Sequence, residues 1–273
     1  MTEMLQYAFF RNAIAGVLII SIVSAIIGTY IVSRRLVAIS GGVTHACFGG
    51  LGLGYFLGIS PLLMAAVVAV GASAGVEWLS SRYKVRQDSA IAVVWALGMA
   101  LGILFVFLTP GYVPELNTFL FGNVLTISYS DLAIFGIFTV IVIIFFAIYY
   151  RSIVACAFDA DFARVIHLPV RFITYTMTVL VAVCIVLTIR LVGIMLLMSM
   201  LALPQMIAEI HYHRFITIML ASVVISAACC ISGLLLSTIL NVPCSALIVL
   251  VMTTVFIIAK TVGAMRIHCK RTQ

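Results

Sequence analysis

The stretch ISGGVTHACFGGLGLGYFLG, residues 39–58, is apolar enough to lie in a membrane, yet it carries one histidine and seven glycines. Glycine weakens a helix by roughly 1 kcal/mol relative to alanine. Small residues recur here at every fourth position, and positions four apart lie on one helix face. The members of this series are Gly42, Ala46, Gly50, Gly54 and Gly58. Such a series lets a second membrane helix approach closely, so we predict a helix-packing face.

His45 lies in the same stretch, nine residues after Leu36, where the apolar segment begins. A helix rises 1.5 Å per residue, which places the histidine about 14 Å into the bilayer. The glycines on its face are Gly41, Gly49 and Gly52. Ionisable residues at this depth usually face a protein interior or a water-filled path, and neutral imidazole is the commonest metal ligand. We expect His45 either to line a cation path, with Thr44 and Cys47 as further lining residues, or to hydrogen-bond across a helix interface.

The composition of the whole chain is that of a membrane protein. The 273 residues are 65% hydrophobic and only 8% charged, whereas a soluble domain carries roughly 25% charged residues. The mean hydropathy is +1.32. The apolar segments are continuous and do not alternate with a period of two, which argues against a membrane barrel.

Nine apolar segments each have about the 20 residues that a helix needs to cross a membrane. They are Asn12–Val32, Leu36–Leu57, Leu62–Leu79, Ser89–Thr109, Leu132–Tyr150, Phe172–Ile189, Leu191–Ala208, Phe215–Leu240 and Ser245–Ala259. The segment 117–130 is compatible with a short re-entrant or interfacial helix. The sequence therefore predicts an all-α, polytopic bundle of about nine transmembrane helices, forming one transmembrane domain over residues 1–273.

The basic residues predict the orientation. If the N-terminus lies outside, 13 of the 15 lysines and arginines face the cytoplasm, and only Arg11 and Arg190 face out. The positive-inside rule favours this arrangement, with the C-terminus in the cytoplasm. The formal charge of +7 then reflects topology and contact with anionic membrane lipid, and it gives no reason to expect a nucleic-acid partner.

Motifs for catalysis or energy conversion are missing from the sequence. It contains no G-x-x-x-x-G-K-[ST] loop for ATP, and its seven cysteines show no metal-finger spacing. Glu209 and His213 in EIHYH would share a helix face, either as metal ligands or as an exposed surface. A transporter of this kind must use an ion gradient or a separate ATPase. The spans lack the paired carboxylates that an ion-coupled carrier would need.

The loop AFDADFARVIHLPVRF, residues 157–172, predicts a short amphipathic helix between two spans. Asp159 can cap its start, and Pro169 would end it. Its apolar face would consist of Phe162, Val165 and Ile166. We expect this helix either to dock on a cytosolic partner or to lie on the membrane surface.

Together these stretches resemble the permease subunits of bacterial ABC importers for zinc, manganese and iron. SRRLVAISGGVTHACFGGLGLGYFLG is similar to that family's arginine pair, Asp-x-x-x-His-Ala and glycine-rich run. DSAIAVVWALGMALG resembles its D-x-x-I-G segment, with Ala92 at the usual glycine. FDADFARVIHLPV resembles F-D-x-x-F-A-x-x-x-G-L-x-V. Two positions depart from the pattern, because Gly41 replaces the acid four residues before the histidine and His167 replaces the loop glycine.

The resemblance implies a type II ABC importer-like fold in the cytoplasmic (inner) membrane of a bacterium. It implies a homodimer with cytosolic ATPase subunits and an extracytoplasmic metal-binding protein. The chain itself would be no enzyme and hold no cofactor; it would carry a divalent metal ion while ATP is hydrolysed by the partner. The loop at about 157–169 would hold the coupling helix, with Phe158, Asp159, Phe162, Ala163, Arg164, Leu168 and Pro169 contacting the ATPase. The alternatives are a permease for an iron chelate or cobalamin-type cargo, and an ion-coupled secondary carrier.

Overall fold

The computed structural model describes residues 7–110, 122 and 124–271, and within these residues every regular element is helical. The elements are α1 (Ala8–Ser33), α2 (Val37–Leu57), α3 (Pro61–Tyr83), α4 (Gln87–Leu108), η2 (Val124–Thr126), α6 (Tyr129–Phe158), α7 (Ala160–Val165), α8 (Val170–Glu209), α9 (Phe215–Leu240) and α10 (Cys244–Arg271). Eight helices in the described residues are long and apolar enough to cross a membrane. The prediction of an all-α, multi-pass membrane protein is therefore confirmed.

Helix α8 joins two of the nine expected spans. Its 40 residues would measure about 60 Å as one straight helix, twice the ~30 Å of a hydrocarbon core. The expected boundary at Arg190 was wrong, because the helix continues through that residue. The break lies instead at Gly193, whose backbone angles are φ 80° and ψ 172°. This region is essentially restricted to glycine, so α8 consists of two helical segments that meet at Gly193.

The short helix expected within 117–130 can be compared with the structure over only part of its length. Residues 111–121 and 123 lie outside the described part of the chain. The remainder of the segment contains the single 3₁₀ turn η2, and α6 begins at Tyr129. Asn12 on α1 donates a hydrogen bond of 3.2 Å from Nδ2 to the carbonyl oxygen of Ile127, which attaches this turn to α1.

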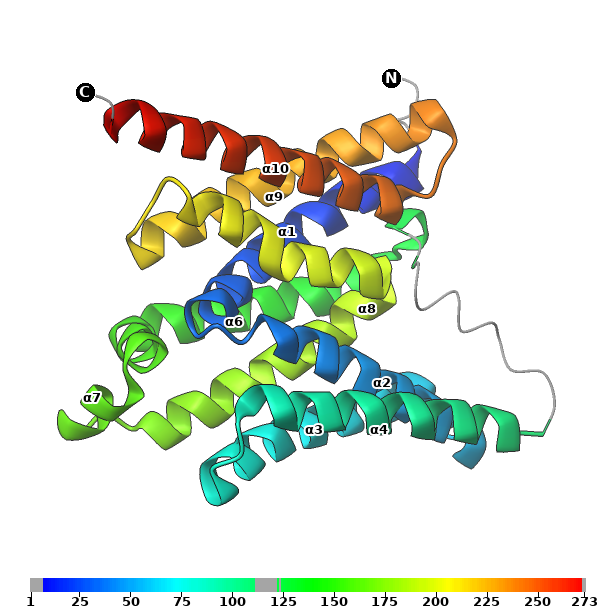
Figure 1. Ribbon diagram of the computed structural model, residues 1–273. Helices are drawn as coiled ribbons and strands as arrows, with labels where there is room; N and C mark the ends of the chain where they lie inside the picture. Colours follow the sequence, from blue (N-terminus) through cyan, green and yellow to red (C-terminus); the bar gives the residue numbers. More distant parts are fainter. Residues whose placement is uncertain (1–6, 111–121, 123, 272–273) are drawn as a thin grey trace. The chain divides into compact units, whose positions relative to one another are not determined.

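The chain folds as two compact units. The first unit contains α1, the start of α6, α8 from Leu191 onward, α9 and α10. Within it, α1 packs on α9 and η2, and α9 packs on α10 (Figure 1). A buried polar contact lies between α1 and α8, where Gln205 Nε2 donates 3.0 Å to the carbonyl oxygen of Ser24. The single permease domain over residues 1–273 stays a prediction.

The second unit contains α2, α3, α4, the end of α6, α7 and the start of α8. Helix α2 packs on both α3 and α4 (Figure 1). The approach of α2 to α4 requires glycine. A Cβ added to Gly52 would lie 2.5 Å from the carbonyl oxygen of Gly102, and one added to Gly49 would lie 2.8 Å from that of Gly98. Real Cβ atoms do not approach oxygen so closely, so backbone meets backbone in this contact.

We expect Gly52→Ala to destabilise the protein and Gly71→Ala to leave it as stable as the unmodified chain or slightly more stable. Both glycines lie inside helices, where alanine is favoured by about 1 kcal/mol. The methyl group at position 52 would meet the backbone of α4, whereas nothing lies within 4 Å of the corresponding point at Gly71 on α3. Overpacking of this kind typically costs about 1–3 kcal/mol. Thermal unfolding of both variants in detergent measures the difference, and equal melting temperatures would contradict the packing described above.

Candidate functional site

The small-residue series of α2 is divided between two partner helices. Gly42 faces Ile91 of α4, where an added Cβ would lie 2.6 Å from the Ile91 side chain, and Gly50 faces Ala65 of α3, with 2.7 Å to its Cα. Ala46 contacts α4 through Gly98, and Gly54 contacts α3 at Pro61. Positions four apart advance by about 40° around a helix with 3.6 residues per turn. A series of five such positions therefore turns too far to face one helix.

Gly58 does not pack on a helix in the described part of the chain. It follows the last residue of α2 with φ 68° and ψ 21°, in the left-handed region, and its N–H bonds back to carbonyl groups of the last turn. Nothing lies within 4 Å of an added Cβ. Gly58 therefore ends the helix as glycine commonly does.

His45 is the ninth residue of the 21-residue helix α2, so it lies near the middle of the span. Its imidazole stacks on the indole of Trp95 from α4, with ring centroids 4.5 Å apart and an interplanar angle of 14°. Nδ1 of His45 lies 3.1 Å from Sδ of Met99, one turn further along α4. The histidine is half-buried and Trp95 is 40% exposed. The structure thus brings one nitrogen and one thioether sulfur together beside an aromatic ring.

The surroundings of His45 differ from the expectation in one respect. Gly49 and Gly52 were expected to leave room around the imidazole, but both close onto the backbone of α4. They share the face of His45 because they follow it by four and seven residues. That face is the one that packs on α4, so the imidazole lies at the rim of a tight helix contact.

Thr44 and Cys47 are not on the face that His45 presents to Trp95 and Met99. Successive helical residues are separated by about 100°, so side chains one or two positions apart do not face each other. Both side chains are buried, and the Thr44 hydroxyl donates to the Ser40 carbonyl inside α2. A lining role for Thr44 and Cys47 stays a prediction.

Trp95 and Met99 were missed by the sequence reasoning, although a signal for them exists. In the segment WALGMALG, positions 95, 98, 99 and 102 follow the spacing of one helix face. Gly98 and Gly102 form a small-xxx-small pair of the kind that α2 also carries. Pairing the two glycine faces would have placed Trp95 and Met99 beside His45.

The alternative ligands at the end of α8 do not form a cluster. Glu209, His211 and His213 are exposed at the turn between α8 and α9. Among the residues that the structure describes, no group of three or more His, Cys, Asp or Glu side chains could hold a metal ion.

The expected amphipathic helix is present as α7 and begins as predicted. The Asp159 carboxylate accepts hydrogen bonds from the backbone N–H groups of Asp161, at 3.0 Å, and Phe162, at 2.9 Å. This is an N-cap, which satisfies donors that the first helical turn leaves free. Ala163 is fully buried, whereas Phe158 and Phe162 are 64% and 57% exposed. The large apolar side chains of this segment are therefore available for contact with another protein or with lipid.

The end of α7 explains the departure at His167. This residue has φ 58°, in the left-handed region that glycine adopts most easily. Its N–H bonds to the Arg164 carbonyl at 3.1 Å, and the N–H of Leu168 bonds to the Ala163 carbonyl at 3.0 Å. These two bonds form a Schellman motif. Histidine adopts this conformation more often than most residues, so the turn is kept without the glycine; Leu168 then lies half-buried and Pro169 exposed before α8.

Comparison with known families identifies the chain. The model of the ABC 3 transport family matches residues 6–263. The chain belongs to the ABC 3 transport family. The resemblance stated from the sequence is thereby confirmed at the level of the family.

Relatives within the ABC 3 family carry names that refer to metals. A Chlamydia pneumoniae protein named "probable metal transport system membrane protein" is 35% identical, over 85% of this chain and 81% of its own length. The manganese transport system membrane protein of Listeria innocua is 30% identical, over 94% of this chain and 91% of its own length. The predicted location, as a multi-pass protein of a bacterial cytoplasmic membrane, agrees with these names and with the apolar helices.

The fold also matches a solved structure. PsaBC from Streptococcus pneumoniae, determined in complex with Fab, contains a chain that superposes with a TM-score of 0.82. The match covers 94% of this chain and 92% of that chain, at 24% sequence identity. At this level of identity the likeness establishes the fold of the ABC 3 chain.

Proposed function

We propose that this chain is the permease subunit through which an ATP-binding-cassette importer moves a divalent transition-metal cation into the cytoplasm. The observation that carries the proposal is the ABC 3 family match over residues 6–263, with relatives at 30% and 35% identity named for manganese and metal transport. Zinc, manganese and iron are the candidate cargoes. A second copy of the chain, cytosolic ATPase subunits and an extracytoplasmic metal-binding protein complete the proposed assembly.

The described residues support this division of work. His45 offers an imidazole near the middle of α2, with the Met99 thioether 3.1 Å away. Two donors from the protein give a partial coordination sphere, which suits an ion that must leave again. Phe158 at the end of α6 and Phe162 on α7 are both exposed, so this segment is available to contact an ATPase.

The donor atoms also bear on the choice of metal. Imidazole suits zinc and iron, thioether ligands suit softer ions, and carboxylate ligands suit manganese. The chain has Gly41 where the resembled family has an acid, four residues before His45. A panel of zinc, manganese and iron, with calcium as the hard-ion control, therefore belongs in the test of function.

The test is ATP-driven uptake by the reconstituted assembly. We expect vesicles that contain this chain with its ATPase and binding protein to accumulate at least one of the three metals when ATP is supplied. The purified chain alone should hydrolyse no ATP, because it carries no P-loop. ATP hydrolysis by the rigorously purified chain would refute the proposal that a separate subunit supplies the ATPase activity. Uptake of an iron chelate or cobalamin in place of free metal would replace the proposed cargo.

A further inference from the structure

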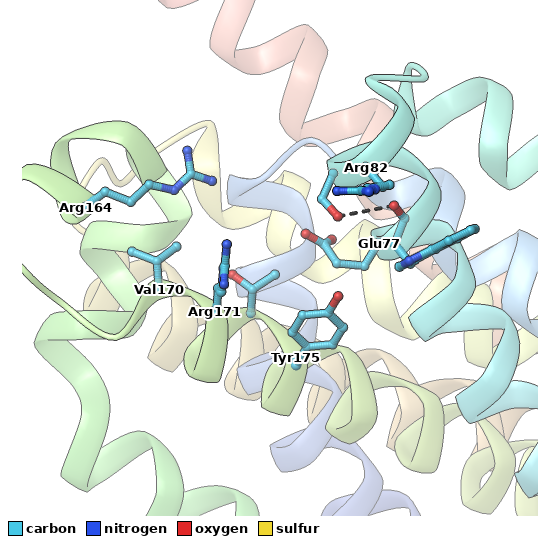
Figure 2. Close-up of a pocket in the computed structure, with 9 residues that line it drawn as sticks. Glu77, Arg82, Arg164, Val170, Arg171 and Tyr175 are labelled. Carbon is cyan, nitrogen blue, oxygen red and sulfur yellow. Dashed lines mark hydrogen bonds between the residues drawn. The ribbon is translucent and has the colours of Figure 1, made fainter.

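A cavity of about 480 Å³ lies in the second unit, where the end of α3 meets α7 and the start of α8. Figure 2 shows its labelled side chains arranged around one space. Glu77 and Arg82 come from α3, Arg164 comes from α7, and Arg171 and Tyr175 come from α8. Three arginines from three helices therefore line one cavity.

Two of these arginines have no ion-pair partner. Arg164 pairs with Asp161 on the same short helix. Within the described ranges, neither Arg82 nor Arg171 forms an ion pair. Glu77 is the acidic residue of the lining, and it accepts a 3.5 Å hydrogen bond from Gln87 Nε2. The cavity thus keeps two guanidinium groups available, each with a planar fork of donors that fits phosphate oxygens.

The backbone adds to the same preference. Helix α8 begins at Val170, and Val170 and Arg171 of its first turn line the cavity. The N–H of Val170 bonds to the Leu168 carbonyl at 2.7 Å, whereas the N–H groups of the next residues in a first helical turn have no acceptor within the helix, and the N-terminal end of the helix dipole is positive. Anions, phosphate among them, bind at such ends. The side-chain charges and the helix terminus therefore favour the same kind of ligand.

The position of the cavity points to the membrane surface. Arg82 lies in the last turn of α3 and Arg171 in the first turn of α8, at helix ends that the positive-inside rule assigns to the cytoplasm. Two aromatic lining residues, Trp78 and Tyr175, are 51% and 41% exposed, and such rings concentrate at headgroup level. Basic pockets between membrane helices on the cytoplasmic side bind acidic lipid headgroups.

We propose that this cavity binds a phosphate group, held by Arg82, Arg171 and the first turn of α8. An anionic phospholipid headgroup and a soluble phosphate share this chemistry, and the experiment below separates them. Because Arg82 belongs to α3 and Arg171 to α8, an occupied cavity would join these two helices through one anion. The proposal concerns a site apart from His45 and does not depend on the proposed function.

The test measures binding of short-chain phosphatidylglycerol to the purified chain in neutral detergent, by native mass spectrometry. We compare the double variant Arg82→Gln/Arg171→Gln with Lys84→Gln/Arg86→Gln, which removes the same charge from the adjoining loop outside the cavity. Losing two charge-assisted hydrogen bonds should weaken binding by roughly tenfold or more. The control should stay within about twofold of the unmodified chain, because Lys84 and Arg86 do not line the cavity.

Competition experiments identify the source of the phosphate, and a further variant separates loss of binding from misfolding. Competition by inorganic phosphate or glycerol phosphate would show that the phosphate group suffices, and its absence would assign the site to a lipid headgroup. Ser81→Asp adds a negative charge at an exposed lining position, so it should weaken binding in a folded chain. Equal losses in the two double variants, unchanged binding in Arg82→Gln/Arg171→Gln, or no binding by the unmodified chain would overturn the proposal.

Discussion

Replacing His45 with alanine should strongly reduce or abolish metal uptake while the protein stays folded and assembled. The imidazole lies near the middle of α2 and has the Met99 sulfur 3.1 Å away. It also occupies the position of the histidine in the resembled family pattern. Removing a residue that only supports a metal ligand already costs about 10–100-fold in affinity or activity. Loss of the ligand itself should therefore lower uptake by at least about tenfold, measured with radiolabelled metal in vesicles.

Two control variants separate ligation from packing. His45→Gln keeps a side chain that can hydrogen-bond across the helix contact but ligates metal poorly. Trp95→Leu removes the stacked ring and leaves the imidazole in place. If His45 acts as a ligand, the glutamine variant should fail and the Trp95 variant should keep most of its uptake. Full uptake by His45→Gln would show that the histidine is a packing residue, and size-exclusion chromatography of each variant checks assembly.

Phe162→Asp should uncouple the permease from its ATPase. Phe162 lies in α7 and is 57% exposed, so the aspartate leaves the isolated chain folded. In the assembled importer the same position would be covered by the partner, where a desolvated charge is costly. Aromatic residues at the centre of interfaces commonly contribute 2 kcal/mol or more. We expect uptake to fall by roughly tenfold or more, together with loss of the ATPase during purification.

The matched control for this prediction is Phe162→Leu, which keeps an apolar side chain at the same position. It should retain most of the transport activity. Normal ATPase binding and normal uptake by Phe162→Asp would show that α7 is not the docking segment. Its exposed apolar side chains would then contact lipid at the membrane surface.

The features that the sequence predicted well depend on residues that are neighbours along the chain. The spans follow from length and hydropathy, and the start of α7 follows from an Asp159 side chain that can reach the next two N–H groups. Both are local properties of the chain. The division of the α2 series between α3 and α4 was less accessible, because it depends on helical rotation and on which helices are neighbours.

Contacts between distant segments were harder to predict, because they depend on which helix faces meet. The pairing of His45 with Trp95 and Met99 requires the glycine faces of α2 and α4 to be aligned. The basic cavity joins Arg82 of α3 to Arg171 of α8, which are far apart in the sequence. In the sequence these arginines indicate only the membrane side on which each loop lies. Their convergence is a property of the tertiary fold.

The break at Gly193 also bears on whether the number of membrane crossings is even or odd. If α8 crossed the membrane once, the eight apolar helices of the described residues would return both ends of the protein to the same compartment. If the segments before and after Gly193 each cross, the described spans number nine and the ends lie in opposite compartments, as the distribution of basic residues predicts. In that case the sidedness of α9 and α10 follows from the break at a single glycine with φ 80°. A residue other than glycine at this position would disfavour the backbone conformation of the break in α8. The distribution of basic residues would still favour the same orientation for the rest of the protein.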